Sequence, residues 1–389
     1  MAISIIQTPN AVNLAQSPIV FAVSESNSEV FTSSSYQYLA QLYYWTGSAS
    51  IPAVADYTLS KYPNTSRTGI FDVSRVINSE LSDISQEVSS SVRYFAVGVY
   101  EQYLSGSTFV TGSTTVSSVY KAIDGYSLFQ EPITQTIQSK TDYWPLMTDG
   151  PATQSFQPDS DNGRMSVWLG SGSDLGVTQL IYSGNIDENS LSVTGGQTST
   201  ENMVGTFPIG VLESDFPISS SNTEYSVQAY SGSEAVSEKL NFTQVCDTKY
   251  DNIRVKWKNR YGQFDYYNFN LVSRQSMNTS RQRYQPQIGS WNARTLSYEQ
   301  YENSVQNYIV DSTQKLSVNS NYVSEDYNDI FKQLMVSDEV YWVTGYTTAE
   351  TLMPLAVQSS NFSIKTTKVD KLIQYSFEFI KGQGYKLII

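Results

Sequence analysis

The side chains that most often carry enzyme chemistry are scarce in this chain of 389 residues, which has no histidine and a single cysteine, Cys246. Without histidine, a serine or cysteine nucleophile lacks its usual general base, and the commonest transition-metal ligand is missing too. The groups that remain for acid–base chemistry are the carboxylates, of which the chain has 37. Two carboxyl groups on either side of a glycosidic bond are sufficient to hydrolyse it. Glycoside hydrolysis is therefore the reaction class that this composition leaves open.

No recognisable motif places two carboxylates in such a site, and no nucleotide-binding motif is present. The sequence contains neither a GxxxxGK[S/T] phosphate loop nor a GxGxxG turn between a strand and a helix. A single cysteine can form neither an intramolecular disulfide nor a cysteine cage for a metal. We therefore predict that the protein is not an enzyme and has no catalytic residues, no cofactor and no metal site.

A row of cations is the most distinctive candidate for binding. In the stretch YDNIRVKWKNRYGQFDYYNFNL, residues 250–271, apolar residues alternate with cations at strand spacing, which predicts one apolar face and one basic face. Gly262 can adopt the positive φ of a short loop, so the stretch is expected to form a hairpin. The candidate contact residues on it are Arg254, Lys256 and Lys258 on the strand and Arg260 in the turn.

The charge of the chain is unevenly distributed. Residues 1–240 carry 8 Lys and Arg and 23 Asp and Glu, residues 241–300 carry 9 and 4, and residues 301–389 carry 7 and 10. A basic segment in an acidic protein can contact nucleic acid or the acidic part of another copy. We favour protein contact, because the segment lacks the charge density and the motifs of nucleic-acid-binding modules. For any single cation, an ordinary solvated strand face is an equal alternative.

Residues 275–311 form a long polar stretch with weak periodicity and many Gln, Asn and Tyr residues. Structureless loops of more than about 15 residues are uncommon in compact domains, so we predict an arm that reaches a neighbouring copy. The alternative is a surface meander with an edge hairpin. Tyr, Trp and Arg are the residue types that dominate interface energetics. The candidate contact residues here are Arg281, Arg283, Tyr284, Trp291, which we expect to be an exposed anchor, and Arg294.

Composition and length predict the fold class. Aromatic residues make up 13% of the chain, and together with many Val, Ile and Thr residues they favour strands over helices. We predict a mainly β protein with two or three antiparallel β-sandwich-like domains and one packed helix in the C-terminal domain. The expected domains are an immunoglobulin-like sandwich at 1–125, a loop-rich middle β domain at 126–240, and a C-terminal β domain with a long hairpin arm and the helix at 241–389.

Apolar periodicity and turn signals predict the individual elements. The helix is expected to follow Ser324 as its cap and to bury Tyr327, Ile330, Phe331 and Leu334 on one stripe. The apolar end of the chain, 385–389, is expected in a sheet or at a subunit contact. The expected strands are 3–6, 19–23, 36–45, 57–60, 68–73 with a helical turn at 74–77, 92–103, 114–122, 165–169, 177–182, 339–345, 361–366 and 372–380.

The first cation is Lys61, so the positive start of a secretory signal is missing, and no apolar run approaches the roughly 20 residues of a membrane-spanning helix. We therefore expect no signal peptide and no membrane span.

Several stretches resemble a group of virion structural proteins of tailed bacteriophages that infect Bacteroidetes, including crAss-like and flavobacterial phages. They are Cys246 followed by YDNIRVKWKNRYGQFDYYNF, and the closing PLAVQSSNFSIKTTKVDKLIQYSFEFIKGQGYKLII. The segments TPNAVNLAQSPIVFAV, from Thr8, and GIFDVSRVI, from Gly69, are similar in style to the same group.

The resemblance implies a β-rich structural subunit that forms a homo-oligomeric ring in the tail, the collar or the portal-vertex connector, made in the host cytoplasm and located in the virion. Its implied partners are other copies of itself and portal, collar or tail proteins, with DNA only as the content of a conduit that the ring lines. The basic segment could contact the acidic first segment of the next copy. Neutralising Arg254, Lys256 and Lys258, or raising the ionic strength, is then expected to weaken assembly.

Two other function classes remain open at this point. A receptor- or glycan-binding adhesin of a tail fibre or baseplate predicts exposed aromatic clusters at loop tips. A polysaccharide-degrading virion enzyme predicts two carboxylates about 5 to 10 Å apart in a groove.

Overall fold

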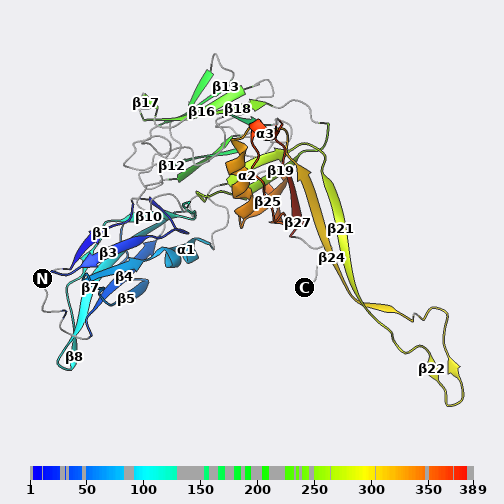
Figure 1. Cartoon of the computed structure of the whole chain (residues 1–389), viewed down its shortest axis with the longest axis horizontal. Helices are drawn as coiled ribbons and strands as arrows, with labels where there is room; N and C mark the ends of the chain where they lie inside the picture. The colour runs from blue at the N-terminus through cyan, green and yellow to red at the C-terminus, as the bar shows by residue number, and fades with distance from the viewer. Residues whose placement is uncertain are drawn as a thin grey trace. The chain divides into compact units, whose positions relative to one another are not determined.

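The computed structural model describes residues 3–128 apart from 11, 27–30, 32–34, 46–49 and 83–91, a set of strands between 153 and 235, and residues 239–382 apart from 245–248, 263, 303, 347–349 and 371. The chain divides into two compact units. Unit 1 comprises residues 1–245 and 258–265, and unit 2 comprises residues 246–257 and 266–389. Strands dominate both (Figure 1), so the prediction of a mainly β, sandwich-like protein is confirmed.

The first part of unit 1 is built from two sheets. One is antiparallel, with the order β1-β3-β6, and the other has the order β2-β10-β7-β4-β5, with β8 and β9 also paired to β7. The second sheet is antiparallel except where β10 runs parallel to β2. The elements are β1 Ser4–Gln7, β2 Val12–Leu14, β3 Val20–Ser24, β4 Gln37–Trp45, β5 Tyr57–Lys61, β6 Thr68–Asp72, α1 Ser74–Ser82, β7 Val92–Ser105, β8 Thr108–Thr111, β9 Thr115–Val116 and β10 Tyr120–Ile123.

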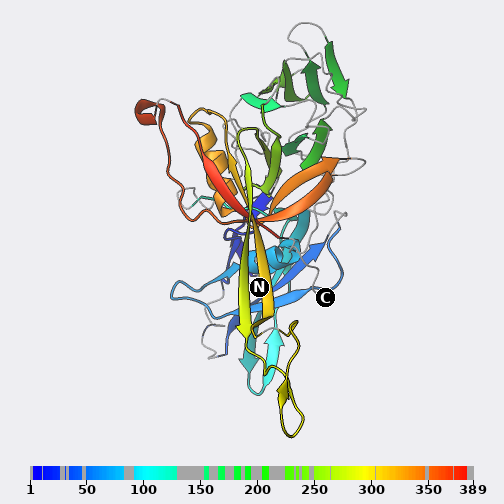
Figure 2. The same ribbon diagram turned by 90° about the vertical axis from the view of Figure 1, so that its right-hand side faces the viewer.

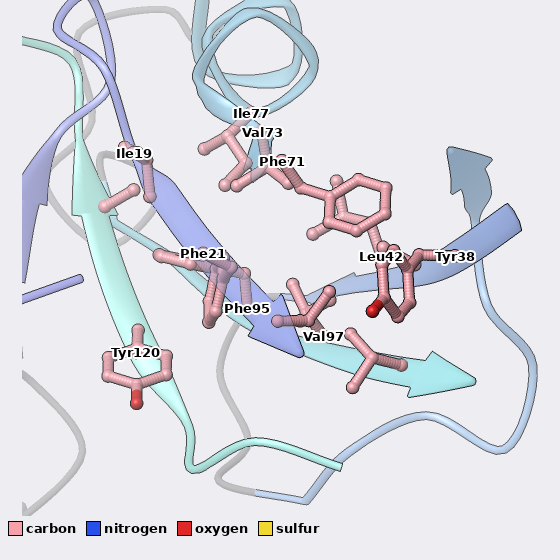
Figure 3. Close-up of a cluster of buried hydrophobic side chains, with 14 of the residues drawn as sticks. Ile19, Phe21, Tyr38, Leu42, Phe71, Val73, Ile77, Phe95, Val97 and Tyr120 are labelled. Atoms are coloured by element: carbon pink, nitrogen blue, oxygen red, sulfur yellow. The ribbon is translucent and has the colours of Figure 1, made fainter. Parts of the chain in front are cut away.

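A continuous apolar core joins these two sheets (Figure 3). Phe21 of β3 packs edge-on against Phe95 of β7 and Tyr120 of β10, with ring centroids 6.3 and 5.6 Å apart. Helix α1 adds Ile77 and Leu81 to the same core, because these residues lie four apart on one stripe. The helical turn expected at 74–77 therefore continues as a helix to Ser82.

The second part of unit 1 contains two further sheets. One has the order β11-β18-β16-β13-β14, with β17 paired to β16, and the other is the pair β12-β15. The strands expected at 165–169 and 177–182 correspond to β12 and β13. The elements are β11 Thr153–Phe156, β12 Met165–Gly170, β13 Gln179–Gly184, β14 Asn189–Val193, β15 Val204–Ile209, β16 Glu224–Ser231, β17 Glu234–Ala235 and β18 Leu240–Gln244.

Unit 2 is organised around a seven-stranded sheet with the order β20-β19-β25-β26-β27-β24-β21. Its strand order differs from the chain order because β26 and β27 lie between β25 and β24. The elements are β19 Ile253–Lys258, β20 Phe264–Phe269, β21 Arg274–Tyr284, β22 Ser290–Trp291, β23 Leu296–Ser297, β24 Gln306–Asn319, α2 Tyr327–Val336, β25 Val340–Tyr346, β26 Glu350–Val357, α3 Thr367–Asp370 and β27 Ser376–Lys381.

Helix α2 packs on this sheet through one stripe, as its periodicity predicts. Phe331 is fully buried and lies in an aromatic cluster with residues of β20 and β27. The prediction that Ser324 caps the helix is wrong. The residue that precedes the helix is Asp326, which makes no side-chain capping bond, and the Ser324 hydroxyl donates to the Asp326 carboxylate at 3.3 Å.

The strand expected at 361–366 is absent, and these residues are held by side chains instead. Phe362 stacks on Tyr375 with ring centroids 5.0 Å apart, and the amide of Lys365 donates to the Tyr375 hydroxyl at 3.1 Å. Strand β26, which the periodicity did not predict, lies in the sheet between β25 and β27. It contains Pro354, whose carbonyl accepts the Gly382 amide at 2.8 Å. The expected apolar run at 385–389 lies outside the described residues.

Candidate functional site

A long two-stranded ribbon extends from the sheet of unit 2 (Figures 1 and 2). We define residues 274–319, from the start of β21 to the end of β24, as the arm. The two strands pair from Arg274–Ser317 at the base to Tyr284–Gln306, with one irregularity after Gln282. Strand β24 pairs with β27 only over its last five residues, from Lys315 to Asn319. Among the described strands, the outer part of β24 is therefore paired with β21 alone.

The arm is open to solvent over most of its length. Every residue of β21 is exposed, and β24 becomes buried only near its end, where Leu316 and Val318 join the core of unit 2. A two-stranded hairpin without a covered face is marginally stable in water. The long hairpin that the polar stretch predicts is present, and its reach to a neighbouring copy stays a prediction.

Hydrogen bonds give the distal end of the arm a defined shape. β22 pairs with β23 across a turn in which the Asn292 side-chain oxygen accepts the amide and the hydroxyl of Thr295, both at 3.0 Å. The amide of Gly289 donates to the Glu302 carboxylate at 2.8 Å. Gly289 has a φ of 80°, in the left-handed region that favours glycine.

The register of this small hairpin creates an apolar surface. Trp291 and Leu296 are directly opposite each other and so share one face. Tyr298 follows the end of β23, and its Cβ lies beside Gly289 together with the Leu296 side chain. A Cβ on Gly289 would lie 3.2 Å from the Leu296 side chain and 3.2 Å from the Cβ of Tyr298. We define Trp291, Leu296 and Tyr298, which are 67%, 54% and 68% exposed, as the tip face.

Five of the predicted contact residues lie on the arm. The Tyr284 hydroxyl donates to the Gln306 side chain at 2.7 Å, and the Trp291 side chain is exposed as predicted. Residue-type reasoning missed Leu296 and Tyr298, because the position of Leu296 opposite Trp291 depends on the register. The predicted contact residues Arg281, Arg283, Tyr284, Trp291 and Arg294 are all exposed.

The predicted basic face of β19 is a different case. Arg254 and Lys256 are only 3% and 6% exposed. The apolar residues that alternate with them are buried as well, so both faces of the strand are covered. Their cationic groups lie 4.7 and 5.5 Å from the centre of the Tyr266 ring on β20. The prediction of a strand with only one dry face is therefore wrong, since an aromatic ring lies over its cations.

The other two cations of the row make contacts within unit 1. Lys258 forms an ion pair with Asp124, and both side chains are almost completely covered. The Arg260 guanidinium lies 4.6 Å from the centre of the Tyr261 ring, and the Arg260 carbonyl accepts the Tyr126 amide at 2.8 Å. Neutralising residues 254, 256 and 258 would therefore perturb contacts inside the chain.

A pair of buried carboxyl groups, Glu25 and Glu101, lies in unit 1. Burial first, and the hydrogen bond with Glu25 second, raise the pKa of Glu101 to about 7, and the Tyr36 hydroxyl donates to Glu101 at 3.4 Å. Glycosidases keep their two carboxyl groups about 5 Å or more apart on either side of a substrate. Buried and in hydrogen-bond contact, this pair is not arranged for that reaction.

The raised pKa of Glu101 predicts how the stability of unit 1 depends on pH. Between the ordinary value of 4.5 and about 7, folded Glu101 keeps its proton while the unfolded residue releases it. The free energy of unfolding should therefore fall as pH rises through this window, and be lowest above it. Thermal melts across the window should show the fall, and Glu101→Gln, which keeps a neutral side chain, should reduce it. An identical pH slope in the variant would contradict this assignment.

No protein-family model matches this sequence, and no curated protein is significantly similar to it. In the described part of the chain, no helix is both long and apolar enough to cross a membrane.

Proposed function

We propose that this protein is a structural subunit of a tailed-phage virion, which forms an oligomeric ring in the tail, collar or portal-vertex connector through β contacts between subunits. The observation that carries the proposal is the arm, a ribbon with exposed faces that ends in aromatic side chains. The resemblance of the sequence to phage virion proteins supports the same role.

The arm is suited to the contact geometry of a ring. Rings form when one surface of a subunit binds a different surface of the next and the rotation closes. A projecting arm on one copy and a separate surface on the next copy provide such a pair. β21 is one of the two edge strands of the seven-stranded sheet among the described strands, so its outer edge can also accept a strand from a neighbour.

On this proposal the protein acts by assembly and catalyses no reaction. Its partners are other copies of the chain and portal, collar or tail proteins, and its location is the virion.

A receptor- or glycan-binding adhesin is the second candidate. It is favoured by the exposed Trp and Tyr side chains at the tip of the arm, because aromatic rings stack on sugars. This candidate predicts binding to host polysaccharide by a subunit that does not need to assemble.

Removing the arm tests the main proposal. Residues 278–313 are replaced by an Asn-Gly turn, which joins the paired residues Met277 and Gln314 with the turn type that suits a two-residue hairpin. We expect the unmodified chain to form rings in negative-stain images and the variant to remain monomeric by light scattering. The melting temperature should be retained, because the deleted residues add no side chain to the core of unit 2.

An unmodified chain that stays monomeric at every concentration, alone and with the other virion proteins, would contradict the assembly role. Binding of that monomer to a polysaccharide array would then support the adhesin.

A further inference from the structure

We propose that the tip face is the part of the arm that binds a second copy of this chain. This inference rests on the proposed function and adds to it the residues that supply the binding energy. Trp291 is the central anchor, with Leu296 directly opposite it and Tyr298 beside Gly289.

Hydrogen bonds within the tip favour the conformation that displays the tip face. The Asn292–Thr295 turn and the Gly289–Glu302 hydrogen bond hold the two short strands in register. A surface that is preorganised loses less conformational entropy on binding than a flexible loop. Most of the free energy gained by burying the three exposed apolar side chains is therefore available to strengthen binding.

The composition of the tip face favours a protein over a sugar as its partner. Leu296 lies directly opposite Trp291, and an aliphatic side chain adds contact area to a protein pocket but offers no ring on which a sugar can stack. Arg294, in the turn beside Trp291, is exposed. An aromatic anchor with a neighbouring Arg is typical of the energetic centre of a protein interface.

The charge distribution favours a second copy as that protein. The arm carries five Lys and Arg and three Asp and Glu, so the rest of the chain holds 19 of the 24 basic and 34 of the 37 acidic residues. The basic excess lies on the two long strands of the arm, which hold Arg274, Arg281, Arg283 and Lys315, whereas the tip holds Arg294 together with Glu299 and Glu302. The long strands of the arm, rather than the tip face itself, are thus attracted to the strongly acidic remainder of any other copy. Because such attraction is screened by salt, self-association should weaken as ionic strength rises.

The first test removes the tip face and keeps the arm. In the full-length chain, Trp291→Ala, Leu296→Ala and Tyr298→Ala are combined, and self-association is measured by sedimentation at several salt concentrations. We expect self-association to weaken by about 30-fold or more, as for an interface hot spot, while the melting temperature is unchanged. The matched control combines Tyr322→Ala, Val369→Ala and Leu372→Ala, three similarly exposed residues of unit 2 outside the arm, and should associate normally.

A second variant changes the shape of the tip and keeps all three side chains. Gly289→Ala introduces a Cβ 2.6 Å from the Ser297 carbonyl oxygen at a residue with positive φ, so the hairpin must shift. We expect weaker self-association without a change in the melting temperature.

The outcomes separate this inference from the proposed function. If the triple variant associates normally while the arm deletion does not, the tip face is not the binding surface, and another part of the arm makes the contact. If both variants associate normally, or the unmodified chain stays monomeric both alone and with the other virion proteins, both proposals fail. Stronger association at high salt would overturn the assignment of an acidic second copy as the partner.

Discussion

Replacing Phe331 by alanine should lower the free energy of unfolding of unit 2 by about 3–5 kcal/mol. Phe331 has no exposed surface, and its ring lies 5.0 Å from that of Tyr267 and 5.2 Å from those of Tyr375 and Phe377. Its removal leaves a cavity between α2 and the sheet, among the aromatic rings that surround Phe331.

Urea denaturation followed by tryptophan fluorescence should show this loss as a lower midpoint with an unchanged slope. Val336→Ala is the matched control, because Val336 ends the same helix and is mostly exposed, so its removal should cost no more than about 0.5 kcal/mol. If Phe331→Ala cost as little as the control, α2 would not pack on the sheet through this residue.

Replacing Lys258 by methionine should be about as damaging to unit 1, at about 3–5 kcal/mol, because it leaves the buried Asp124 carboxylate without its ion-pair partner. The Gln16 side-chain amide would still donate to Asp124, at 2.8 Å, but an amide does not neutralise the charge. Changing both residues, as Lys258→Met with Asp124→Leu, should recover much of the loss, since no unpaired buried charge then remains.

A double-mutant cycle on the free energies of unfolding measures this coupling. The exposed pair Lys332–Asp329 on α2 is the control, and Lys332→Met should cost no more than about 0.5 kcal/mol. If the double variant lost as much as the sum of the single variants, Lys258 and Asp124 would contribute to stability independently.

Local patterns were sufficient for the helix of unit 2 and for its last described strand. Phe331 and its neighbours on α2 have helical spacing, and Tyr375, Phe377 and Phe379 alternate into the core at strand spacing, so both elements could be predicted. The polar stretch after β20 was too long for a loop and therefore predicted a hairpin. The exposure of Trp291 followed from its position in that stretch.

The cations of β19 show where local pattern fails. Alternation placed Arg254 and Lys256 on one face correctly, but it carried no information about the Tyr266 ring that lies over them. The pairing of Glu25 with Glu101 could not be predicted for the same reason, since the two residues are far apart in the sequence. In the arm, the register alone brought Leu296 opposite Trp291.

The sequence by itself determined the strand-rich character of this protein, the helix of unit 2, the long hairpin and the kinds of side chain that the hairpin displays. These properties depend on neighbours within a few positions, where backbone geometry fixes which residues share a face. Only the tertiary structure decided which cations are buried, which carboxyl groups meet and which three side chains form the tip face. Those outcomes depend on strand order and register, which bring together residues that no local spacing relates.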